Sequence, residues 1–383
     1  MSDPVDELAP QACVSCREKK RKCSREVPVC SLCRRNRRPC HYPPKTASPF
    51  AESSESYIRQ NTFPAIFFLD LYTFNKRRSV IPAPTITLPD KYYKALGSRE
   101  QLHYHVDNYF SMIHPILPIV SKLRIYHQLS KSLDALDADL VLLFLAMQMH
   151  CERDGHNPPR TEIYDLAKQC CLHAEQSNMF SPRLLQASLL IAMYEVGNAI
   201  YPAAYLTVGH CARLGHVMGI NNTKDGPQMF SKPESWAEAE ERRRAWWAVI
   251  MLDRYVTLGG GNRPFACSDA NPGDLLPMDE ESWEKGEPTL IQPLVVSEYT
   301  AVRASPFART SQASHLLSHV LRHVNDGYED VKFHYEEAIQ LHRTIDTFSL
   351  AISHELNDIK GAVRDWTHTC SHFTAMAICY SAQ

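Results

Sequence analysis

Six of the 13 cysteines fall in one short stretch near the N-terminus, where they form the spacing C-x2-C-x6-C twice. They are Cys13, Cys16, Cys23, Cys30, Cys33 and Cys40. Thiolates two residues apart at the start of a helix can chelate one soft cation, and a third thiolate six residues on can return to the same ion after about two helical turns. Two tetrahedral zinc ions need about eight ligand positions, so six thiolates are enough only if two of them bridge both ions. The spacing therefore predicts a compact two-zinc cluster.

Other uses of these cysteines fit less well. Cross-brace zinc domains usually need eight Cys or His ligands, and His41 is the only spare one nearby. A disulfide knot needs an oxidising compartment, but Met1–Pro10 is polar and has no signal-peptide run. The apolar run Leu140–Met147 is too short to cross a membrane, so we expect a soluble intracellular protein. We expect the seven other cysteines to be small core residues: Cys151, Cys170, Cys171, Cys211, Cys267, Cys370 and Cys379.

The elements that hold the six cysteines must depend on the metal. The segment is an internal repeat, CVSCREKKRKC followed by CSLCRRNRRPC, with too few apolar residues for a core. Metal binding should therefore supply the free energy of folding. We expect a short helix over residues 16–23, with its cations pointing outward because the ligands face inward. Residues 11–45 carry 11 Lys and Arg against two acids, a charge of +9, so the rest of a chain of net charge −2 carries −11.

These residues resemble the fungal zinc binuclear cluster (Zn2Cys6) family of transcription factors. The likeness rests on the six cysteines, on the basic run Arg17–Lys22 between the second and third of them, and on Pro28 two residues before the fourth. It implies two zinc ions per chain, with Cys13 and Cys30 as the bridging thiolates. It also implies a nuclear regulator of RNA polymerase II genes that binds double-stranded DNA at CGG-type sites, together with co-regulators.

The resemblance also suggests which side chains contact DNA. A helix in the major groove can offer Lys or Arg to the O6 and N7 atoms of guanine. Lys19 and Lys20 are the expected base contacts, and Arg17, Lys22 and Arg25 are the expected phosphate contacts. A second basic group follows: Arg34, Arg35, Arg37 and Arg38. The simpler interpretation of any one cation is a solvated charge or part of a nuclear-import signal, which is compatible with DNA binding.

The chain divides into three regions by composition. Residues 11–45 are the cluster domain, 46–97 a linker rich in proline and serine, and 98–383 an all-α regulatory domain. The apolar segment 63–74 within the linker is expected to dock on the large domain, with binding to a partner as the alternative. No sustained heptad pattern follows the cluster, so we do not expect a coiled coil, and a monomer and a homodimer through the large domain both stay open. Because the chain ends just after a predicted helix, a short chain and an incomplete one are also open alternatives.

The large domain shows a helical period and no convincing alternating strand. An apolar stripe begins at Leu102, and Asp139 is expected to cap a central helix that ends at His150. Other helix signals are Thr161 before a helix to about 178, Ser181–Pro182 before one to about 200, Pro202 before one to Gly219, and a glycine run after Trp236–Leu258. The remaining predicted helices cover about 313–326, 328–348 and 358–380.

Two segments of this domain resemble the middle homology region of the same family. They are Tyr109–Ile119 and Glu241–Pro264, and the resemblance extends over about 100–300. We expect Arg242–Arg244 to pair with Glu238, Glu240 and Glu241 rather than with DNA, because this part of the chain is acidic. Asp253 and Arg254 should tie the glycine loop to its helix. His114 should be a core histidine.

No catalytic constellation is found in the sequence. His354–Glu355 lacks the second histidine of a zinc-protease helix, and the glycine run Gly259–Gly261 lacks the lysine and the spacing of a phosphate loop. We therefore expect a transcription factor rather than an enzyme, and the resemblance suggests a regulator of a secondary-metabolic gene cluster. One alternative is a metabolite sensor whose helical domain encloses an apolar pocket. Another is a zinc-dependent RNA or protein adaptor.

Overall fold

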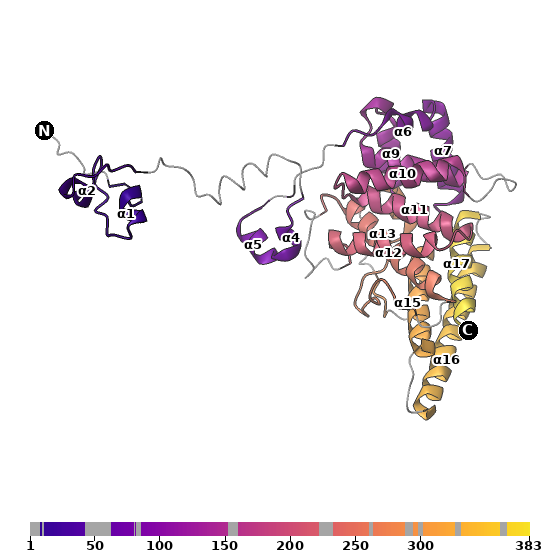
Figure 1. Ribbon diagram of the computed structural model, residues 1–383. Helices are drawn as coiled ribbons and strands as arrows, with labels where there is room; N and C mark the ends of the chain where they lie inside the picture. Colours follow the sequence, from indigo (N-terminus) through magenta and orange to yellow (C-terminus); the bar gives the residue numbers. More distant parts are fainter. Residues whose placement is uncertain are drawn as a thin grey trace. The chain divides into compact units, whose positions relative to one another are not determined.

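The computed structural model divides the chain into two compact units, Met1–Pro64 and Ala65–Gln383 (Figure 1). The structure describes residues 8–9, 11–42, 63–79, 81, 86–151, 160–221, 233–259, 263–287, 294–297, 302–325, 331–360 and 366–383. Over these residues it contains helices and two isolated β-bridges but no strand, which confirms the predicted fold class of a small cysteine cluster followed by a large all-α domain. The expected proline- and serine-rich tether at 46–62 lies outside the described residues.

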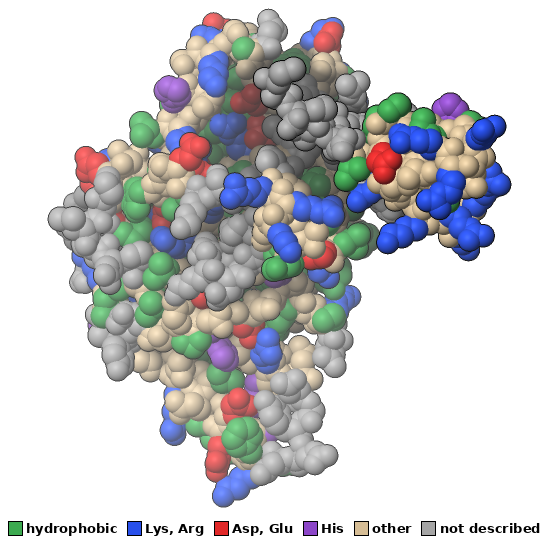
Figure 2. Space-filling view, turned by 90° about the vertical axis from the view of Figure 1, so that its left-hand side faces the viewer, with side chains coloured by type: hydrophobic (Ala, Val, Ile, Leu, Met, Phe, Trp, Pro, Cys, Tyr) green, Lys and Arg blue, Asp and Glu red, His purple; other side chains and the backbone are tan. Residues whose placement is uncertain are grey.

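The first unit consists of two similar halves. Its helices are α1 (Val14–Glu18) and α2 (Ser31–Arg35), and each begins directly after a cysteine with an extended backbone. Each helix is followed by a residue with positive φ, Lys20 at 48° and Arg37 at 46°. The Lys and Arg side chains of both halves are exposed and crowd the surface of this small unit (Figure 2). The repeat in the sequence is therefore also a repeat in the backbone.

The helix expected over residues 16–23 is wrong in its bounds, because α1 ends at Glu18 and Lys19 is its C-cap. The amide of Arg21 donates a hydrogen bond to the carbonyl of Cys16 (2.9 Å), which turns the chain back. A continuous helix would carry Cys23 about 10 Å along the axis from Cys16. The helix must end early for the third cysteine to rejoin the other two.

Three short helices begin the second unit: α4 (Ile66–Leu69), α5 (Leu71–Lys76) and α6 (Asp90–Ala95). The Asp70 carboxylate caps α5 by accepting the amide of Thr73 at 2.9 Å. The rings of Phe67 and Phe74 pack edge to face, with centroids 5.3 Å apart. Docking of the segment 63–74 on the large domain stays a prediction. Tyr92 of α6, in contrast, lies in the core of the helical unit.

The helical unit has its main core around α9. This helix is buried from Leu140 to Met149 and packs against α7, α10 and α11, so the prediction of a central helix is confirmed. The elements of this core are α7 (Arg99–Met112), α8 (Lys122–Leu129), η1 (Leu133–Ala135), α9 (Ala138–Cys151), α10 (Glu162–Gln176), α11 (Pro182–Gly197), α12 (Ala203–Met218) and α13 (Trp236–Thr257). No helix in the described ranges is both long and apolar enough to span a bilayer.

The helix starts predicted at Thr161 and Ser181 are confirmed, because each hydroxyl accepts an amide at the start of its helix, and the end predicted at Gly219 is confirmed by its φ of 72°. Ser98, which was not among the predicted caps, caps α7 in the same way. Asp139, however, is not the cap of α9, because that helix begins at Ala138. The Asp139 carboxylate lies in the first turn and accepts a hydrogen bond from Arg183 at 3.3 Å.

A second, smaller core lies among the last helices. The elements here are α15 (Pro306–Asn325), α16 (Val331–Lys360) and α17 (Trp366–Ala382), whereas α14 (Glu280–Lys285) packs against α8. Leu317 of α15 and Phe348 of α16 belong to this core. The expected helices exist with different bounds: α15 begins before the predicted 313, α16 continues past the predicted 348 to Lys360, and α17 begins at Trp366 rather than at about 358. The first turns of α15 bury Ser311, whose hydroxyl donates a hydrogen bond to the carbonyl of Phe307 at 2.9 Å. Because this buried face contains polar residues, the hydrophobic pattern does not reveal where α15 begins.

Buried arginines connect the helices of this unit. Arg244 is fully buried, donates to Glu240 at 2.8 Å and to the carbonyl of Met278 at 2.7 Å, and lies over the Trp283 ring. Arg242 pairs with Glu238 at 2.5 Å. These contacts confirm the expected pairing within α13. Glu241 differs from the expectation, because it pairs with Arg124 of α8 instead.

Asp253 and Arg254 hold residues 266–269 beyond the glycine run, while residues 260–262 of the predicted glycine loop lie outside the described residues. The Asp253 carboxylate accepts the amides of Ala266 and Cys267 at 3.1 and 3.2 Å. Arg254 donates to Asp269 at 2.9 Å and to Ser318 of α15 at 2.7 Å. One buried pair therefore ties both the chain after the glycine run and α15 to α13.

His114 is a buried residue of the core, as the sequence predicts. Its ring stacks on Trp283 with centroids 5.9 Å apart, and its Nε2 lies 3.5 Å from a carboxylate oxygen of Glu284. Burial lowers the pKa of His114, which favours the neutral imidazole.

Candidate metal centre and nucleic-acid interface

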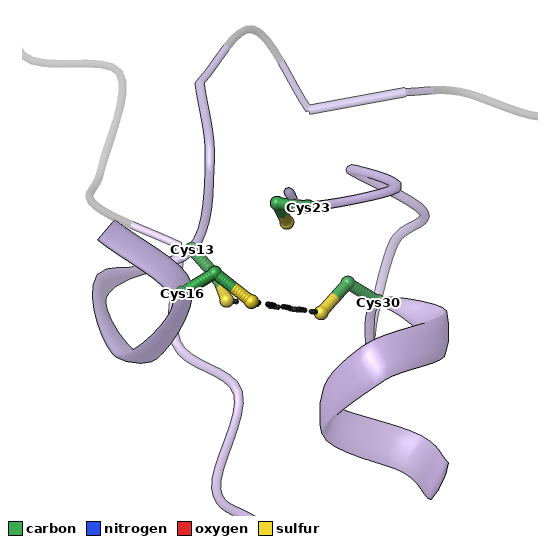
Figure 3. Close-up of side chains that lie close together, drawn as sticks. All are labelled: Cys13, Cys16, Cys23 and Cys30. Carbon is green, nitrogen blue, oxygen red and sulfur yellow. Dashed lines mark hydrogen bonds between the residues drawn. The ribbon is translucent and has the colours of Figure 1, made fainter. Parts of the chain in front are cut away.

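The six cysteines of the first unit form two overlapping sets of four. Within each set the sulfur atoms lie within 4.8 Å of one another. The sets are Cys13, Cys16, Cys23, Cys30 and Cys13, Cys30, Cys33, Cys40. Figure 3 shows the first set, whose side chains converge from α1, from the loop after it and from the start of α2. Cys13 and Cys30 are common to both sets.

The sulfur separations suit metal ligands rather than disulfides. Cys13 Sγ lies 3.8 Å from Cys30 Sγ and 3.6 Å from Cys33 Sγ, and Cys16 Sγ lies 3.7 Å from Cys30 Sγ. A disulfide bond is about 2.05 Å long. Two thiolates on one tetrahedral zinc, each about 2.3 Å from the metal, lie roughly 3.8 Å apart. The donor set therefore fits zinc.

The short helices place the ligands by their first turns. Cys13 and Cys30 are the N-caps of α1 and α2, and Cys16 and Cys33 lie one turn further on. The Cys33 amide donates to Cys30 Sγ at 3.4 Å. Each C-x2-C pair is thus a helix start, the position where free amides favour a negatively charged sulfur.

The environment of the thiols explains why a cation is needed. Burial raises the pKa of Cys16 to about 12, and it raises the pKa of Cys13 as well. Burial also opposes ionisation of Cys30, but the hydrogen bond from the Cys33 amide and those from neighbouring thiols outweigh it and lower the pKa of Cys30 to about 6. Most of these buried sulfurs would stay protonated by themselves. Metal ions replace those protons and offset the repulsion among the thiolates.

The predicted DNA contacts all lie on the surface of this unit. Arg17 is in the last turn of α1, Lys19 is its C-cap, and Lys20 occupies the left-handed turn after it. Lys22 and Arg25 follow in the loop, and Arg25 also has a positive φ of 63°. All five side chains are exposed. The structure therefore brings the predicted cations together at the end of α1 and in the loop after it.

Residues that were not predicted as metal ligands or DNA contacts form hydrogen bonds that connect the ends of this unit to its middle. The Ala9 amide donates to the carbonyl of Arg25 at 2.8 Å, and the Val14 amide donates to that of His41 at 2.9 Å. The Tyr42 hydroxyl donates to the carbonyl of Glu26 at 2.7 Å. These residues cannot be predicted from the sequence, because hydrogen bonds between backbone groups leave no pattern of residue types. Tyr42, an aromatic residue two positions after the last cysteine, was the one visible signal.

Comparison with known proteins identifies both units. The model of the fungal Zn(2)-Cys(6) binuclear cluster domain matches residues 11–49, and that of the fungal specific transcription factor domain matches residues 106–367, which is more than half of the chain. The chain belongs to the fungal-specific transcription factors with a Zn(2)-Cys(6) cluster. In this family the cluster is a DNA-binding domain that holds two zinc ions through its six cysteines, and the family members are transcription factors, not enzymes.

Several proteins similar to this chain are named as fungal transcription factors. Transcription factor BOA15 of Botryotinia fuckeliana is 42% identical over 36% of this chain and 76% of its own length. Transcription factor tazR of Aspergillus terreus is 28% identical over 50% of this chain, and the pigment biosynthesis transcriptional activator pigB of Monascus ruber is 26% identical over 51%. The matched parts cover only 31% of tazR and 36% of pigB. No solved structure matches the chain.

The helical unit contains a cavity of about 280 Å³ beside α8, α9, α11 and α13, lined by charged, polar and apolar side chains. Its lining includes Arg124, Arg183 and Glu238. These charges are paired within the protein, Arg124 with Glu241, Arg183 with Asp139, and Glu238 with Arg242. This lining differs from the deep apolar pocket that the metabolite-sensor alternative predicts.

Proposed function

We propose that this protein is a zinc-dependent, sequence-specific DNA-binding transcription factor of the nucleus that recognises CGG-type sites in the major groove and regulates RNA polymerase II genes. The observation that carries the proposal is the pair of overlapping four-sulfur sets, in a unit whose exposed surface is covered by Lys and Arg. Two zinc ions fix this surface, since the buried cluster among the described residues of this unit consists of cysteines. The proposed recognition surface is therefore rigid only when metal is bound.

Cys13 and Cys30 are the proposed bridging thiolates. Each belongs to both four-sulfur sets, so each zinc ion gains four ligands only if these two sulfurs are shared. Both residues are also buried completely. Because each is the N-cap of one helix, two shared sulfurs would connect the two halves of the unit.

Lys19 and Lys20 are the proposed base contacts, and Arg17, Lys22 and Arg25 the proposed phosphate contacts. The C-cap and the left-handed turn project Lys19 and Lys20 beyond the end of α1, so a groove-bound α1 can present both ammonium groups to base edges. The three arginine and lysine side chains around them are exposed and can reach the flanking backbone.

The helical unit is the proposed regulatory domain, spanning 98–383 after the cluster domain at 11–45 and the linker at 46–97. The relative pigB is named as a transcriptional activator of pigment biosynthesis. By likeness to that protein, we propose that this chain regulates the genes of one biosynthetic pathway of secondary metabolism. Its buried ion pairs and acidic balance leave DNA binding to the cluster.

The test is a gel-shift competition between a CGG-type duplex and a scrambled duplex at matched salt. The Lys20→Ala variant should lose its preference between the duplexes while it keeps two zinc ions. The Arg25→Ala variant should weaken binding to both duplexes equally and lower the slope of log affinity against log salt by about one. Lys131→Ala, which removes an exposed charge of the helical unit, is the matched control and should change nothing.

Two results would contradict this function. Retained preference in the Lys20→Ala variant would show that the end of α1 does not contact bases. Equal competition by a single-stranded RNA would favour an adaptor that binds RNA instead.

A further inference from the structure

We propose a third metal site in this protein, a zinc site formed by His323, His334 and Glu337 in the helical unit. It lies where α15 ends and α16 begins. Each of the three residues offers one ligand atom, and these atoms lie within 4.8 Å of one another. The proposal goes beyond DNA binding, because the site belongs to a unit that has its own apolar core.

Two helices bring the three side chains together. His323 is in the last turn of α15, while His334 and Glu337 are three residues apart on α16 and so share a face of that helix. Nδ1 of His323 lies 2.8 Å from Oε2 of Glu337. The rings of His323 and His334 are stacked with centroids 3.8 Å apart and an interplanar angle of 12°. The hairpin of α15 and α16 therefore gathers the donors that neither helix has alone.

The donor set has the chemistry of a zinc site. Two imidazoles and one carboxylate are established zinc ligands, and three protein ligands leave a fourth position for water. Zinc lies about 2.0 to 2.2 Å from such donors, so two donors on one ion are roughly 3.3 Å apart. The stacked rings of His323 and His334 do not yet direct their nitrogen atoms at one ion, so zinc binding requires the half-buried side chains of His334 and Glu337 to turn. A metal ion would replace the hydrogen bond between His323 and Glu337.

The consequence of this site is a tie between α15 and α16. α15 also packs against α13 and α17, and its Ser318 accepts a hydrogen bond from the buried Arg254. Zinc at the end of α15 should therefore stabilise the C-terminal group of helices. Unlike the cysteine cluster, it would strengthen a core that already exists.

The test uses the full chain with both cluster zincs in place, titrated with Zn²⁺ in a calorimeter. The wild-type protein should bind one further zinc ion per chain. His334→Ala and Glu337→Gln should weaken this binding by about tenfold or more, because loss of a ligand costs at least as much as loss of a supporting hydrogen bond. Glu337→Gln keeps an acceptor for His323, so this variant should fold like the wild type, which helical circular dichroism checks.

One histidine variant serves as a control. His342→Ala removes an exposed histidine of the same helix α16 and should leave the third zinc in place. Zinc should raise the melting temperature of the helices in the wild type and in this control, but not in Glu337→Gln.

Three results would overturn the assignment. The first is no third zinc in the wild type, and the second is a third zinc held equally well by Glu337→Gln and His334→Ala. The third is loss of binding only on His319→Ala. The Nε2 atoms of His315 and His319 on α15 are 3.2 Å apart, so that result would place the metal at this other pair.

Discussion

The cysteine unit and the helical unit of this protein are each stabilised by a different kind of interaction. The fully buried residues of the first unit's cluster are Cys13, Cys16, Cys30 and Cys33. The second unit buries a large core of Leu, Val, Ala and aromatic residues around α9. A short chain with few apolar residues gains too little from burial to offset its loss of conformational entropy, so metal–thiolate bonds must supply the difference.

Arginine shows the same contrast between the units. In the cysteine unit Arg17 and Arg25 are exposed, because there is no core in which to bury them. In the helical unit Arg244, Arg254 and Arg309 are fully buried and paired with carboxylates. The first group is available to a partner, whereas the second holds helices together. The function of a charged residue therefore depends on the unit around it more than on its type.

The largest expected effect is that of removing the metal. Cys30→Ser takes a ligand from both four-sulfur sets, so it should release both zinc ions, unfold the cysteine unit and abolish DNA binding. Cys40→Ser takes a ligand from one set and should leave one zinc ion bound more firmly than the other. Zinc content per chain and gel shifts measure both effects.

Cys151→Ser, outside the cluster, is the control and should keep both zinc ions and DNA binding. Helical circular dichroism should change little in any of these variants, because the helical unit has its own core. Two zinc ions retained by Cys30→Ser would remove the case for a bridging sulfur at this position.

The next effect is specific to the helical unit. Arg244→Met removes one of the two arginine partners of the buried Glu240 and also leaves the carbonyl of Met278 without its donor, which should lower the free energy of unfolding by about 2 to 3 kcal/mol. Zinc content and the cysteine unit should not change. Lys285→Met, which breaks an exposed pair with Glu281, is the matched control and should change the stability by less than about 0.5 kcal/mol. Urea unfolding followed by circular dichroism distinguishes the two, and equal losses would show that burial of the pair does not matter.

Two glycines of α12 should respond with opposite signs. A Cβ atom at Gly215 would lie 2.6 Å from Cζ3 of Trp246 on α13, so Gly215→Ala should destabilise the helical unit by about 1 to 3 kcal/mol. Nothing lies within 4 Å of a Cβ at Gly209, so Gly209→Ala should stabilise it by about 0.5 to 1 kcal/mol. Thermal melts of the two variants measure the difference. The same sign for both would mean that packing against Trp246 is not tight.

The smallest effect is a pH dependence of the helical unit. Burial, and then the neighbouring His319, lowers the pKa of His315 to about 4. Between about pH 6.5 and pH 4 the unfolded chain therefore binds a proton at this position that the folded chain does not. The free energy of unfolding should fall as the pH drops through this range.

The His315→Gln variant isolates this effect. It should lose about 1 kcal/mol less than the wild type over the range, a figure reduced for the partial exposure of the ring. Urea unfolding at several pH values, followed by the helical signal, gives both slopes. Identical slopes would mean that the folded state binds this proton as readily as the unfolded chain.

The sequence predicted the general architecture well. The helix starts at Thr161 and Ser181 were found because a cap is a local signal, formed by a residue and the amide three positions later. The bounds of α1 and α15 were wrong because tertiary demands set them. α1 must end for Cys23 to return to the cluster, and α15 buries serines that a hydrophobic period does not count.

For the metal centre, the cysteine spacing alone is enough to predict the ligands and the metal, because zinc geometry constrains residues that are close in the chain. The left-handed turn at Lys20 and the pairing of Glu241 with Arg124 of α8 became visible in the folded chain. Only the tertiary structure brought His334 and Glu337 against His323, an arrangement without a recognisable spacing. A site formed by residues close in the chain leaves a recognisable motif in the sequence. Contacts between helices depend on how the helix faces pack, which no short motif encodes.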